Sequence, residues 1–381
     1  MSLALVLVGL YLPLDDRPPN WAPCRWQIVL CPPSELYRGP LGIDYLGLRS
    51  WLLETPGEFL LVSWDALAYG GLLQSRSQSR TPSAALVRAG SALIWKSRYQ
   101  GELQGFWVLP RYPDARYRER NLSAIQRTEP WEAHTEVVWD DALPPSPAPR
   151  EASGLPFATR PGADEAAQVQ LLAILRPGLK VKVLYDDPQA AWKVTPYEGI
   201  PLYQTVAGIL NSSGAQTSLE PDLVLYIYTG QAPARAFYQI ATSPYPVAVA
   251  DIAQVNRADP RLLEALVQNS RFGDLASYAA WGTPANNIGS ALAQAGLLQG
   301  PGRLCALAES YLQYRYSQVR GPLDPEAILE LLNREPFPEL ASYRLELQRL
   351  ELPWQRSFEA DFGFSLHPPV GSALDCGLSS S

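Results

Sequence analysis

The sequence is poor in the residues that build metal centres and disulfide frameworks. Four of its 381 residues are cysteine and two are histidine. Cys24 and Cys31 lie seven positions apart, which fits neither a Cys-x-x-Cys motif nor another spacing typical of zinc ligands. We therefore predict reduced thiols in a cytoplasmic protein, with neither a bound metal nor another cofactor.

The chain also lacks a basic excess and a long apolar run. Its formal net charge is −7, whereas nucleic-acid binding requires a basic face. We interpret the nearest basic cluster, Arg116, Arg118 and Arg120, as a solvated loop face. No run reaches the ~20 apolar residues of a membrane span, and the start, Met1 to Leu14, lacks the basic residues of a secretory signal. We expect a small-molecule or oligosaccharide partner, neither nucleic acid nor membrane, and leave the oligomeric state open.

A further absence separates two kinds of α/β fold. An open, doubly wound sheet usually carries a glycine-rich phosphate turn after its first strand. Here the first strand runs into Asp15, Asp16 and Arg17, and the chain has neither a GxGxxG motif nor a P-loop. We therefore favour a (β/α)8 barrel, the TIM-like fold, over the open sheet.

The chain does contain a repeated alternation of strand-like and helix-like segments. Such alternation predicts parallel strands joined by right-handed crossovers. The predicted strands are Ala4–Tyr11, Phe59–Trp64, Gly105–Leu109, Thr135–Trp139, Lys180–Tyr185, Leu223–Tyr228, Val247–Ala250 and Leu275–Ala280. The predicted helices include Pro82–Lys96, Gly162–Leu175, Pro201–Asn211, Pro260–Gln268 and Pro284–Ala295.

We place this barrel in residues 1–300 and a smaller annex, packed on it, in residues 301–381. The annex is predicted to contain two helices, Leu304–Ser317 and Pro325–Asn333, and then a β-hairpin-like pair of segments at 343–352 and 356–364. The Pro-, Ala- and Ser-rich segment Leu143–Pro161 is predicted to be a loop over the barrel mouth. The last dozen residues are predicted to be frayed.

Polar and aromatic side chains follow nearly every predicted strand, which places them at the catalytic mouth of a parallel barrel. Carboxylates and amides bind sugar hydroxyls, and Trp or Tyr covers the apolar face of a sugar ring. For any single residue a helix cap or a core position is the commoner interpretation, and Asp164 and Glu165 most simply complement a helix N-terminus. The candidate substrate-binding residues are Asp15, Asp16, Arg17, Asn20, Asp65, Tyr69, Arg111, Tyr228, Asp251, Asn256, Trp281 and Asn286.

The fourth predicted strand is the most informative. Thr135–Trp139 runs directly into Asp140 and Asp141, and so apolar a run seldom ends in two acids for solubility alone. Adjacent carboxylates repel each other, which favours protonation of one while the other stays ionised. An acid/base catalyst beside an electrostatic stabiliser needs this combination, so we predict that Asp140 and Asp141 are catalytic.

Four longer motifs stand out along the chain: Leu12–Asn20 (LPLDDRPPN), Ser63–Leu72 (SWDALAYGGL), Pro161–Glu165 (PGADE) and Tyr278–Asn287 (YAAWGTPANN). Together with Leu352-Pro353-Trp354 and Phe358-Glu359 near the C-terminus, they resemble the domain-of-unknown-function 4127 family. The resemblance covers nearly the whole chain and implies a bacterial protein, without a settled activity. The chain departs from the family pattern at Gly282, where the family tends to carry Asn.

Three shorter signals are Val137–Asp141, the Asp251–Asn256 strand end with Asp259, and Trp281 with Asn286. They resemble family 84 glycoside hydrolases, which remove N-acetylhexosamine. The resemblance implies that Asp140 holds and polarises the acetamido group of the substrate, and that Asp141 protonates the leaving oxygen and later activates water. Such substrate-assisted cleavage retains the anomeric configuration without an enzyme nucleophile.

We therefore expect a glycoside hydrolase-like enzyme that acts on an N-acetylhexosamine-containing sugar. Two alternatives stay open. One is a metal-assisted hydrolase or lyase on a carbohydrate, in which Asp15, Asp16, Asp65 or Asp251 would bind Mg²⁺ or Ca²⁺ through oxygen. The other is a sugar-binding protein without catalysis.

Overall fold

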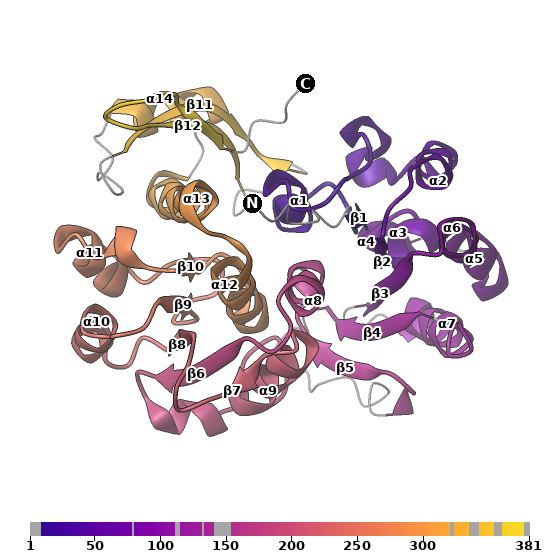
Figure 1. The fold of residues 1–381 in the computed structure, drawn as a ribbon, viewed down its shortest axis with the longest axis horizontal. Helices are drawn as coiled ribbons and strands as arrows, with labels where there is room; N and C mark the ends of the chain where they lie inside the picture. Colours follow the sequence, from indigo (N-terminus) through magenta and orange to yellow (C-terminus); the bar gives the residue numbers. More distant parts are fainter. Residues whose placement is uncertain are drawn as a thin grey trace, which may run out of the picture. The chain divides into compact units, whose positions relative to one another are not determined.

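The computed structural model describes residues 9–77, 80–110, 115–131, 133–140, 154–320, 324–334, 343–353 and 360–376. The chain groups into two compact units, Met1–Gln170 and Leu171–Ser381, and each is described by itself (Figure 1). The predicted boundary at residue 300 falls inside the second unit. The division into a barrel of residues 1–300 and an annex of residues 301–381 stays a prediction.

A five-stranded parallel sheet forms the centre of the first unit, with its strands in chain order from β1 to β5 (Figure 1). All residues of β1 and β2 are buried, as are the last five of β3. Such continuous burial is typical of parallel strands covered on both faces. The strands are β1 Gly9–Leu12, β2 Phe59–Ser63, β3 Glu102–Leu109, β4 His134–Trp139 and β5 Ala158–Pro161.

Helices connect these strands, and two of them begin at side-chain caps. Asp44 caps α2 by accepting the N–H of Gly47 at 3.2 Å, and Thr81 caps α5 by accepting the N–H of Ala84 at 3.3 Å. The single helix predicted over Pro82–Lys96 is two helices that meet at Gly90. The helices are α1 Pro18–Arg25, η1 Ser34–Leu36, η2 Gly39–Leu41, α2 Tyr45–Glu54, α3 Trp64–Ala68, α4 Leu72–Ser77, α5 Pro82–Ala89, α6 Ser91–Tyr99 and α7 Ala115–Gln126; α8 Ala166–Leu175 leads into the second unit.

The second unit contains a parallel sheet with the order β10-β9-β8-β6-β7. Helix α12 packs on β8, β9 and β10, while α10 and α11 lie on the other face (Figure 1). The strands are β6 Lys180–Tyr185, β7 Gln216–Thr217, β8 Leu223–Tyr228, β9 Val247–Asp251 and β10 Ser277–Ala279. The helices are η4 Pro188–Trp192, α9 Leu202–Ser212, α10 Pro233–Ala241, α11 Pro260–Gln268, η5 Phe272–Asp274 and α12 Pro284–Leu297.

The end of the chain adds two helices and a small antiparallel sheet to the second unit. Helices α13 (Gly300–Val319) and α14 (Pro325–Arg334) precede strands β11 (Arg344–Glu351), β12 (Asp361–His367) and β13 (Leu374–Cys376). β11 pairs with β12, and β12 with β13, both antiparallel. Phe362 and Phe364 of β12 enter the hydrophobic core of the unit. The paired segments predicted for the annex are thus present, but β13 forms within the segment predicted to be frayed.

The structure confirms the α/β class with parallel strands. Within the described residues the parallel strands form two five-stranded sheets, and a closed eight-stranded barrel is not seen. Each of the eight predicted strands overlaps a strand of the structure, although Ala4 to Val8 lie outside the described residues. Besides β13, two strands of the parallel sheets were not predicted: β7, and β5, which lies in the segment predicted to be a loop.

Both pairs of cysteines form disulfides, so the prediction of reduced thiols is wrong. Cys24 bonds to Cys31, and Cys305 of α13 bonds to Cys376 of β13. The Cα atoms lie 5.9 and 5.6 Å apart, within the range that a disulfide requires. The second pair is 71 residues apart in sequence, and its spacing gave no signal because the pairing of β12 with β13 fixes the position of Cys376.

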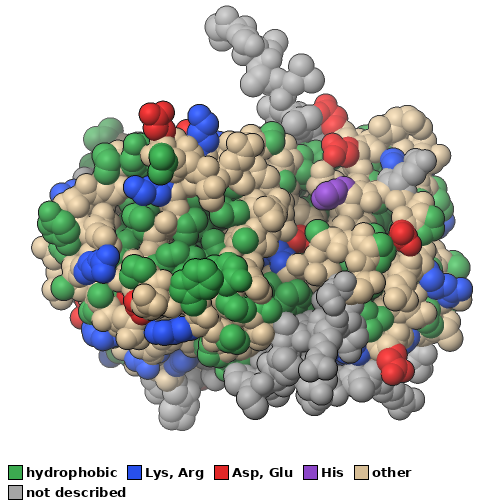
Figure 2. All heavy atoms as spheres, turned by 90° about the horizontal axis from the view of Figure 1, so that it is seen from below, with side chains coloured by type: hydrophobic (Ala, Val, Ile, Leu, Met, Phe, Trp, Pro, Cys, Tyr) green, Lys and Arg blue, Asp and Glu red, His purple; other side chains and the backbone are tan. Residues whose placement is uncertain are grey.

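None of the helices in the described part of the chain combines the length and the apolar character that a bilayer span requires. Figure 2 shows one face of the molecule, on which Lys and Arg side chains are scattered among hydrophobic and uncharged groups.

Candidate functional site

Polar side chains lie at the carboxyl ends of the parallel strands in both units. In the first unit, Asp15, Asp65 and Asp140 follow β1, β2 and β4; in the second, Asp186 follows β6 and Asp251 ends β9. Parallel strands present their carboxyl ends at one edge of a sheet, and ligands of α/β proteins bind at that edge. Each edge is therefore a candidate site within its own unit.

Asp15 is held by a buried arginine. Its carboxylate accepts hydrogen bonds from Nε of Arg17 at 3.0 Å and from Nδ2 of Asn20 at 2.8 Å. Arg17 also donates to Asp164, at 2.6 Å. Burial raises the pKa of Asp15, although the charge of Arg17 acts in the opposite direction. Three predicted residues thus come together, but their polar groups bind one another; Asp16, beside them, is partly exposed.

Asp65 has the least satisfied carboxyl group at this edge. It lies in α3, directly after β2, and is fully buried. Its Oδ2 accepts the N–H of Val108 on β3 at 2.7 Å, whereas its Oδ1 has no hydrogen-bond partner. Burial raises the pKa of Asp65 to about 7. Near neutral pH the group therefore populates both protonation states, which a general acid or base requires.

Asp140 lies beside this group at the end of β4. Its N–H donates to the carbonyl of Leu109, the residue that follows Val108 on β3, at 3.0 Å. Its carboxylate forms an ion pair with Arg76 of α4. The positive charge of Arg76 also lowers the pKa of Asp65, against the larger effect of burial. One arginine thus acts on both carboxyl groups.

Tyr69 and Arg120 complete the group of side chains around Asp65. The guanidinium of Arg120, on α7, lies 4.5 Å from the centre of the Tyr69 ring, and its charge also lowers the pKa of Asp65. Arg118 is buried as well. The interpretation of this basic cluster as a solvated loop face is therefore wrong for Arg118 and Arg120. Two predicted residues, Asp141 and Arg111, lie outside the described residues.

A buried ion-pair group beside β4 was not predicted. Arg160 of β5 donates to Glu136 of β4 at 2.7 Å and to Glu165 at 2.6 Å. Gln170 donates to the second oxygen of Glu136 at 3.2 Å. Burial raises the pKa of Glu165 to about 7, while Arg160 lowers it. Glu165 was predicted to complement a helix N-terminus, but it also has a buried ionic partner. The sequence signal for this ion-pair group was Arg160, a charged residue within a Pro-rich segment.

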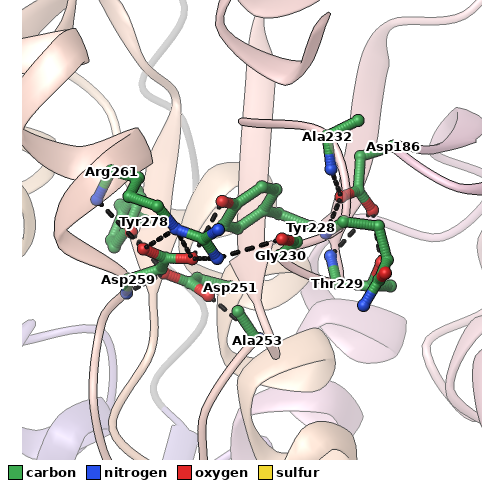
Figure 3. Close-up of polar contacts among 11 residues, drawn as sticks. Asp186, Tyr228, Thr229, Gly230, Ala232, Asp251, Ala253, Asp259, Arg261 and Tyr278 are labelled. Carbon is green, nitrogen blue, oxygen red and sulfur yellow. Dashed lines mark hydrogen bonds and ion pairs between the residues drawn. The ribbon is translucent and has the colours of Figure 1, made fainter. Parts of the chain in front are cut away.

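In the second unit, Asp251 is a buried carboxyl group with both oxygens occupied (Figure 3). Its Oδ2 accepts the hydroxyl of Tyr278 and the N–H of Asp259, both at 2.7 Å, and its Oδ1 accepts the N–H of Ala253 at 3.1 Å. Burial raises its pKa to about 7. These bonds fix the segment between β9 and α11, so Asp251 holds the chain in this arrangement.

Asp259 joins Tyr228 to Arg261 in the same view (Figure 3). Its Oδ2 accepts the hydroxyl of Tyr228 at 2.9 Å, and its Oδ1 accepts Nε of Arg261 at 3.0 Å. Burial opposes its ionisation, but the bonds from Arg261 hold the pKa of Asp259 below its usual value. The hydroxyl of Tyr228, predicted to bind substrate, thus donates to Asp259.

Asp186 has a similar structural role after β6. It accepts the N–H and the hydroxyl of Thr229, at 2.8 and 2.7 Å, and the N–H groups of Gln231 and Ala232, at 2.9 and 3.1 Å (Figure 3). These four bonds shape the turn between β8 and α10. Asp186 therefore stabilises a turn and leaves neither carboxylate oxygen without a hydrogen bond.

The loop after β10 depends on a glycine. Asn287 accepts the N–H of Gly282 at 2.8 Å and donates to the carbonyl of Asp251 at 2.9 Å. A Cβ at Gly282 would lie 2.8 Å from Cβ of Asn286. Asn256 has a φ of 55° and donates its N–H to the carbonyl of Gly282 at 3.2 Å. The backbone of this loop thus ties Asn256 to Gly282, while the Nδ2 of Asn286 donates to the hydroxyl of Thr283 at 3.1 Å.

A narrow hollow adjoins this loop. Trp281 lies in its wall, and its Nε1 is buried without a hydrogen-bond partner. The empty volume, about 190 Å³ including space open to solvent, is too constricted to hold a sugar ring in this conformation. Its walls come from Asn256, Arg257, Ala258, Trp281, Gln313, Tyr316, Ser317 and Arg320.

Metal ligands are not clustered in the described part of the chain, where no three His, Cys, Asp or Glu side chains are grouped as a metal ion requires. Two of the four carboxylates considered as ligands for Mg²⁺ or Ca²⁺ are engaged elsewhere: Asp15 by Arg17, and Asp251 by Tyr278 and backbone N–H groups. The predicted lack of a cofactor stays a prediction.

Comparison with known proteins gives one match. A model of the family described as protein of unknown function DUF4127 matches residues 9–131 and 147–321. No curated protein and no solved structure matches the chain. Since the matched residues make up most of the sequence and include the motifs at Leu12–Asn20, Ser63–Leu72 and Tyr278–Asn287, the chain belongs to the domain-of-unknown-function 4127 family.

Proposed function

We propose that the protein is a glycoside hydrolase-like enzyme that cleaves an N-acetylhexosamine-containing sugar with retention of configuration. One observation carries the proposal: two carboxyl groups of different character lie at the carboxyl edge of one parallel sheet. Asp65 has a pKa of about 7 and an oxygen without a partner, and Asp140 is paired with Arg76. Groups whose environments separate their protonation states are typical of acid/base catalysis.

In the proposed reaction, the acetamide oxygen of the substrate attacks the anomeric carbon as the bond to the leaving oxygen breaks. Asp140 orients and polarises the acetamido group, and Asp141 gives its proton to the leaving oxygen. Asp141 then takes a proton from water, whose oxygen attacks the anomeric carbon and releases the acetamide oxygen. The roles of Asp140 and Asp141 follow from the resemblance to family 84. Asp65 is the group we add, as a second site that can hold a proton at neutral pH.

The proposal does not require the strands to close into a (β/α)8 barrel. Substrates bind at the carboxyl ends of parallel strands both in barrels and in open sheets. Nor does it depend on a cytoplasmic location. Disulfides such as Cys24–Cys31 are typical of oxidising compartments and of proteins from hyperthermophiles, so they do not favour that location.

Leaving-group dependence tests the role of Asp141. For Asp141→Asn we expect turnover of a chitooligosaccharide, which has a poor leaving group, to be abolished, with a smaller loss for an aryl N-acetylglucosaminide whose leaving group needs no protonation. Asp274→Asn, at a position 66% exposed in the side chain, is the control and should match the wild type. Equal losses on both substrates would contradict the assignment of Asp141 as the acid.

The same assays separate the alternatives. Activity that disappears in a chelator and returns with Mg²⁺ or Ca²⁺ would replace the proposal with metal-assisted chemistry. Binding of the oligosaccharide without any turnover of either substrate would indicate a sugar-binding protein.

A further inference from the structure

Two aromatic rings stand side by side on the surface of the second unit. Trp192, the last residue of η4, is 69% exposed, and Tyr203, near the start of α9, is 39% exposed. Their ring centres lie 4.9 Å apart, and the ring planes are tilted by 52°. Trp64 and Trp107, by contrast, are fully buried. Burial of an aromatic side chain contributes a large favourable free energy. The exposure of this contacting pair therefore indicates a binding surface.

The backbone beneath the rings is held rigidly. Asp187 caps η4, and the carbonyl of Lys193 accepts the N–H of Leu202 at 3.0 Å. The N–H and the hydroxyl of Thr195 both donate to the carbonyl of Ile200, at 3.0 and 3.2 Å. The segment from η4 to α9 is therefore tied to itself on both sides of Trp192, and a ligand would meet a surface that needs little further ordering.

Hydrogen-bonding groups border the two rings. Gln204 donates to the hydroxyl of Tyr203 at 3.0 Å, which leaves its amide oxygen as an acceptor. Lys193 and Asp187, 3.4 Å apart, are 63% and 25% exposed in their side chains. A surface with flat apolar rings and a polar border matches a pyranose, which has apolar C–H faces and a rim of hydroxyl groups.

We infer that Trp192 and Tyr203 form a surface site for an oligosaccharide of pyranose units. The choice of sugar rests on the proposed function. The size of the patch argues for a sugar over a second protein. An aromatic side chain covers ~150–250 Å², so two partly exposed rings fall well short of the ~800 Å² per partner of a stable protein interface.

The test is calorimetric binding of N-acetylchitotetraose to the full chain, in the Asp141→Asn background so that the probe is not consumed. We expect Trp192→Ala to weaken binding by about tenfold, which corresponds to ~1.4 kcal/mol, and Tyr203→Ala to weaken it less. Tyr238→Ala is the matched control, because Tyr238 of α10 is 67% exposed and has no ring contact within the described residues. It should bind as the parent does.

The outcomes separate this inference from the proposed function. In the active protein, Trp192→Ala should leave hydrolysis of the small aryl N-acetylglucosaminide unchanged. Binding that depends on Trp192 in a protein that hydrolyses neither substrate would keep the surface site and overturn the glycosidase. Unchanged affinity in Trp192→Ala, or no binding by the parent, would overturn the surface site. A Trp192→Ala variant that sediments as a smaller species would show that a second copy covers the rings, and would also overturn it.

Discussion

The hydroxyl of Tyr278 on β10 donates a hydrogen bond of 2.7 Å to the buried carboxyl of Asp251, the last residue of β9. The same Asp251 oxygen accepts the N–H of Asp259, also at 2.7 Å. One oxygen thus links two adjacent strands to the turn before α11, and it loses half of its partners if the hydroxyl is removed.

We therefore expect Tyr278→Phe to lower the free energy of unfolding by about 1–3 kcal/mol, as the loss of a buried hydrogen bond does. Urea unfolding at pH 8 is the measurement. Tyr238→Phe removes a hydroxyl from a side chain that is 67% exposed and should change stability by less than about 0.5 kcal/mol. Equal midpoints for Tyr278→Phe and the wild type would show that this bond contributes nothing.

The raised pKa of Asp65 predicts how stability depends on pH. Between its unfolded value near 3.9 and its folded value of about 7, the folded protein holds a proton that the unfolded chain has released. Stability therefore falls as pH rises through this window, by about 1.4 kcal/mol per pH unit for one proton, and levels off above the folded pKa.

Asp65→Asn should remove that contribution, because the amide does not ionise. The slope of stability against pH between 5 and 6.5 should become less negative by about 1.4 kcal/mol per pH unit, measured by urea unfolding. Asp251 and Glu165, whose pKa values are also raised to about 7, act equally in both proteins and cancel. Asp274→Asn should keep the wild-type slope, and a wild-type slope in Asp65→Asn would refute the prediction.

The two disulfides should differ in their effect on stability. Cys305–Cys376 spans 71 residues and Cys24–Cys31 spans seven. In the chain-entropy model, the longer loop stabilises by about 4 kcal/mol and the shorter by about 2–3 kcal/mol. Both double variants should unfold at a lower urea concentration than the wild type. The midpoint should fall further for Cys305→Ser/Cys376→Ser than for Cys24→Ser/Cys31→Ser. The reverse order would indicate that structure in the unfolded chain outweighs loop length.

Breaking the buried ion pairs of Arg160 should be costly. Arg160→Met leaves Glu136 and Glu165 without their shared cation, and removal of one partner from a buried ion pair costs about 3–5 kcal/mol. Thermal unfolding is the measurement. Adding Glu136→Gln and Glu165→Gln should restore part of the loss, because the uncompensated charges are then gone. A triple variant no more stable than Arg160→Met would assign the effect to lost packing instead.

The strands could be predicted because most are short, apolar and bounded by turn residues. β6 and β8 begin and end at the predicted residues, and β2 and β4 differ from the predictions by one residue at one end. β5 was not predicted because Ala158, Thr159, Arg160 and Pro161 lack an apolar pattern. It is an edge strand, which pairs only with β4 within the described residues. The number of sheets depends on which strands pair with each other when they are far apart in the sequence. A local sequence pattern does not encode this pairing.

The candidate site could be predicted only in outline. That carboxylates gather after the strands was visible in the sequence, but whether each carboxylate is a cap or a ligand depends on its partners. The carboxylate oxygens of Asp186 and Asp251 accept hydrogen bonds from backbone N–H groups and hydroxyls, whereas one oxygen of Asp65 has no hydrogen-bond partner. Arg160 meets Glu136 across 24 positions, which the spacing of neither residue foretells.

The absence of a side chain at Gly282 makes the residues allowed at positions 282 and 286 depend on each other. The Asn expected here from the resemblance to the family would bring a Cβ to within 2.8 Å of Cβ of Asn286, while the N–H of residue 282 must still reach Asn287. A relative with Asn at this position therefore needs a displaced α12 start or a glycine at position 286. The two positions should covary across the family, and sequences that combine Asn at both should carry a differently shaped loop after β10.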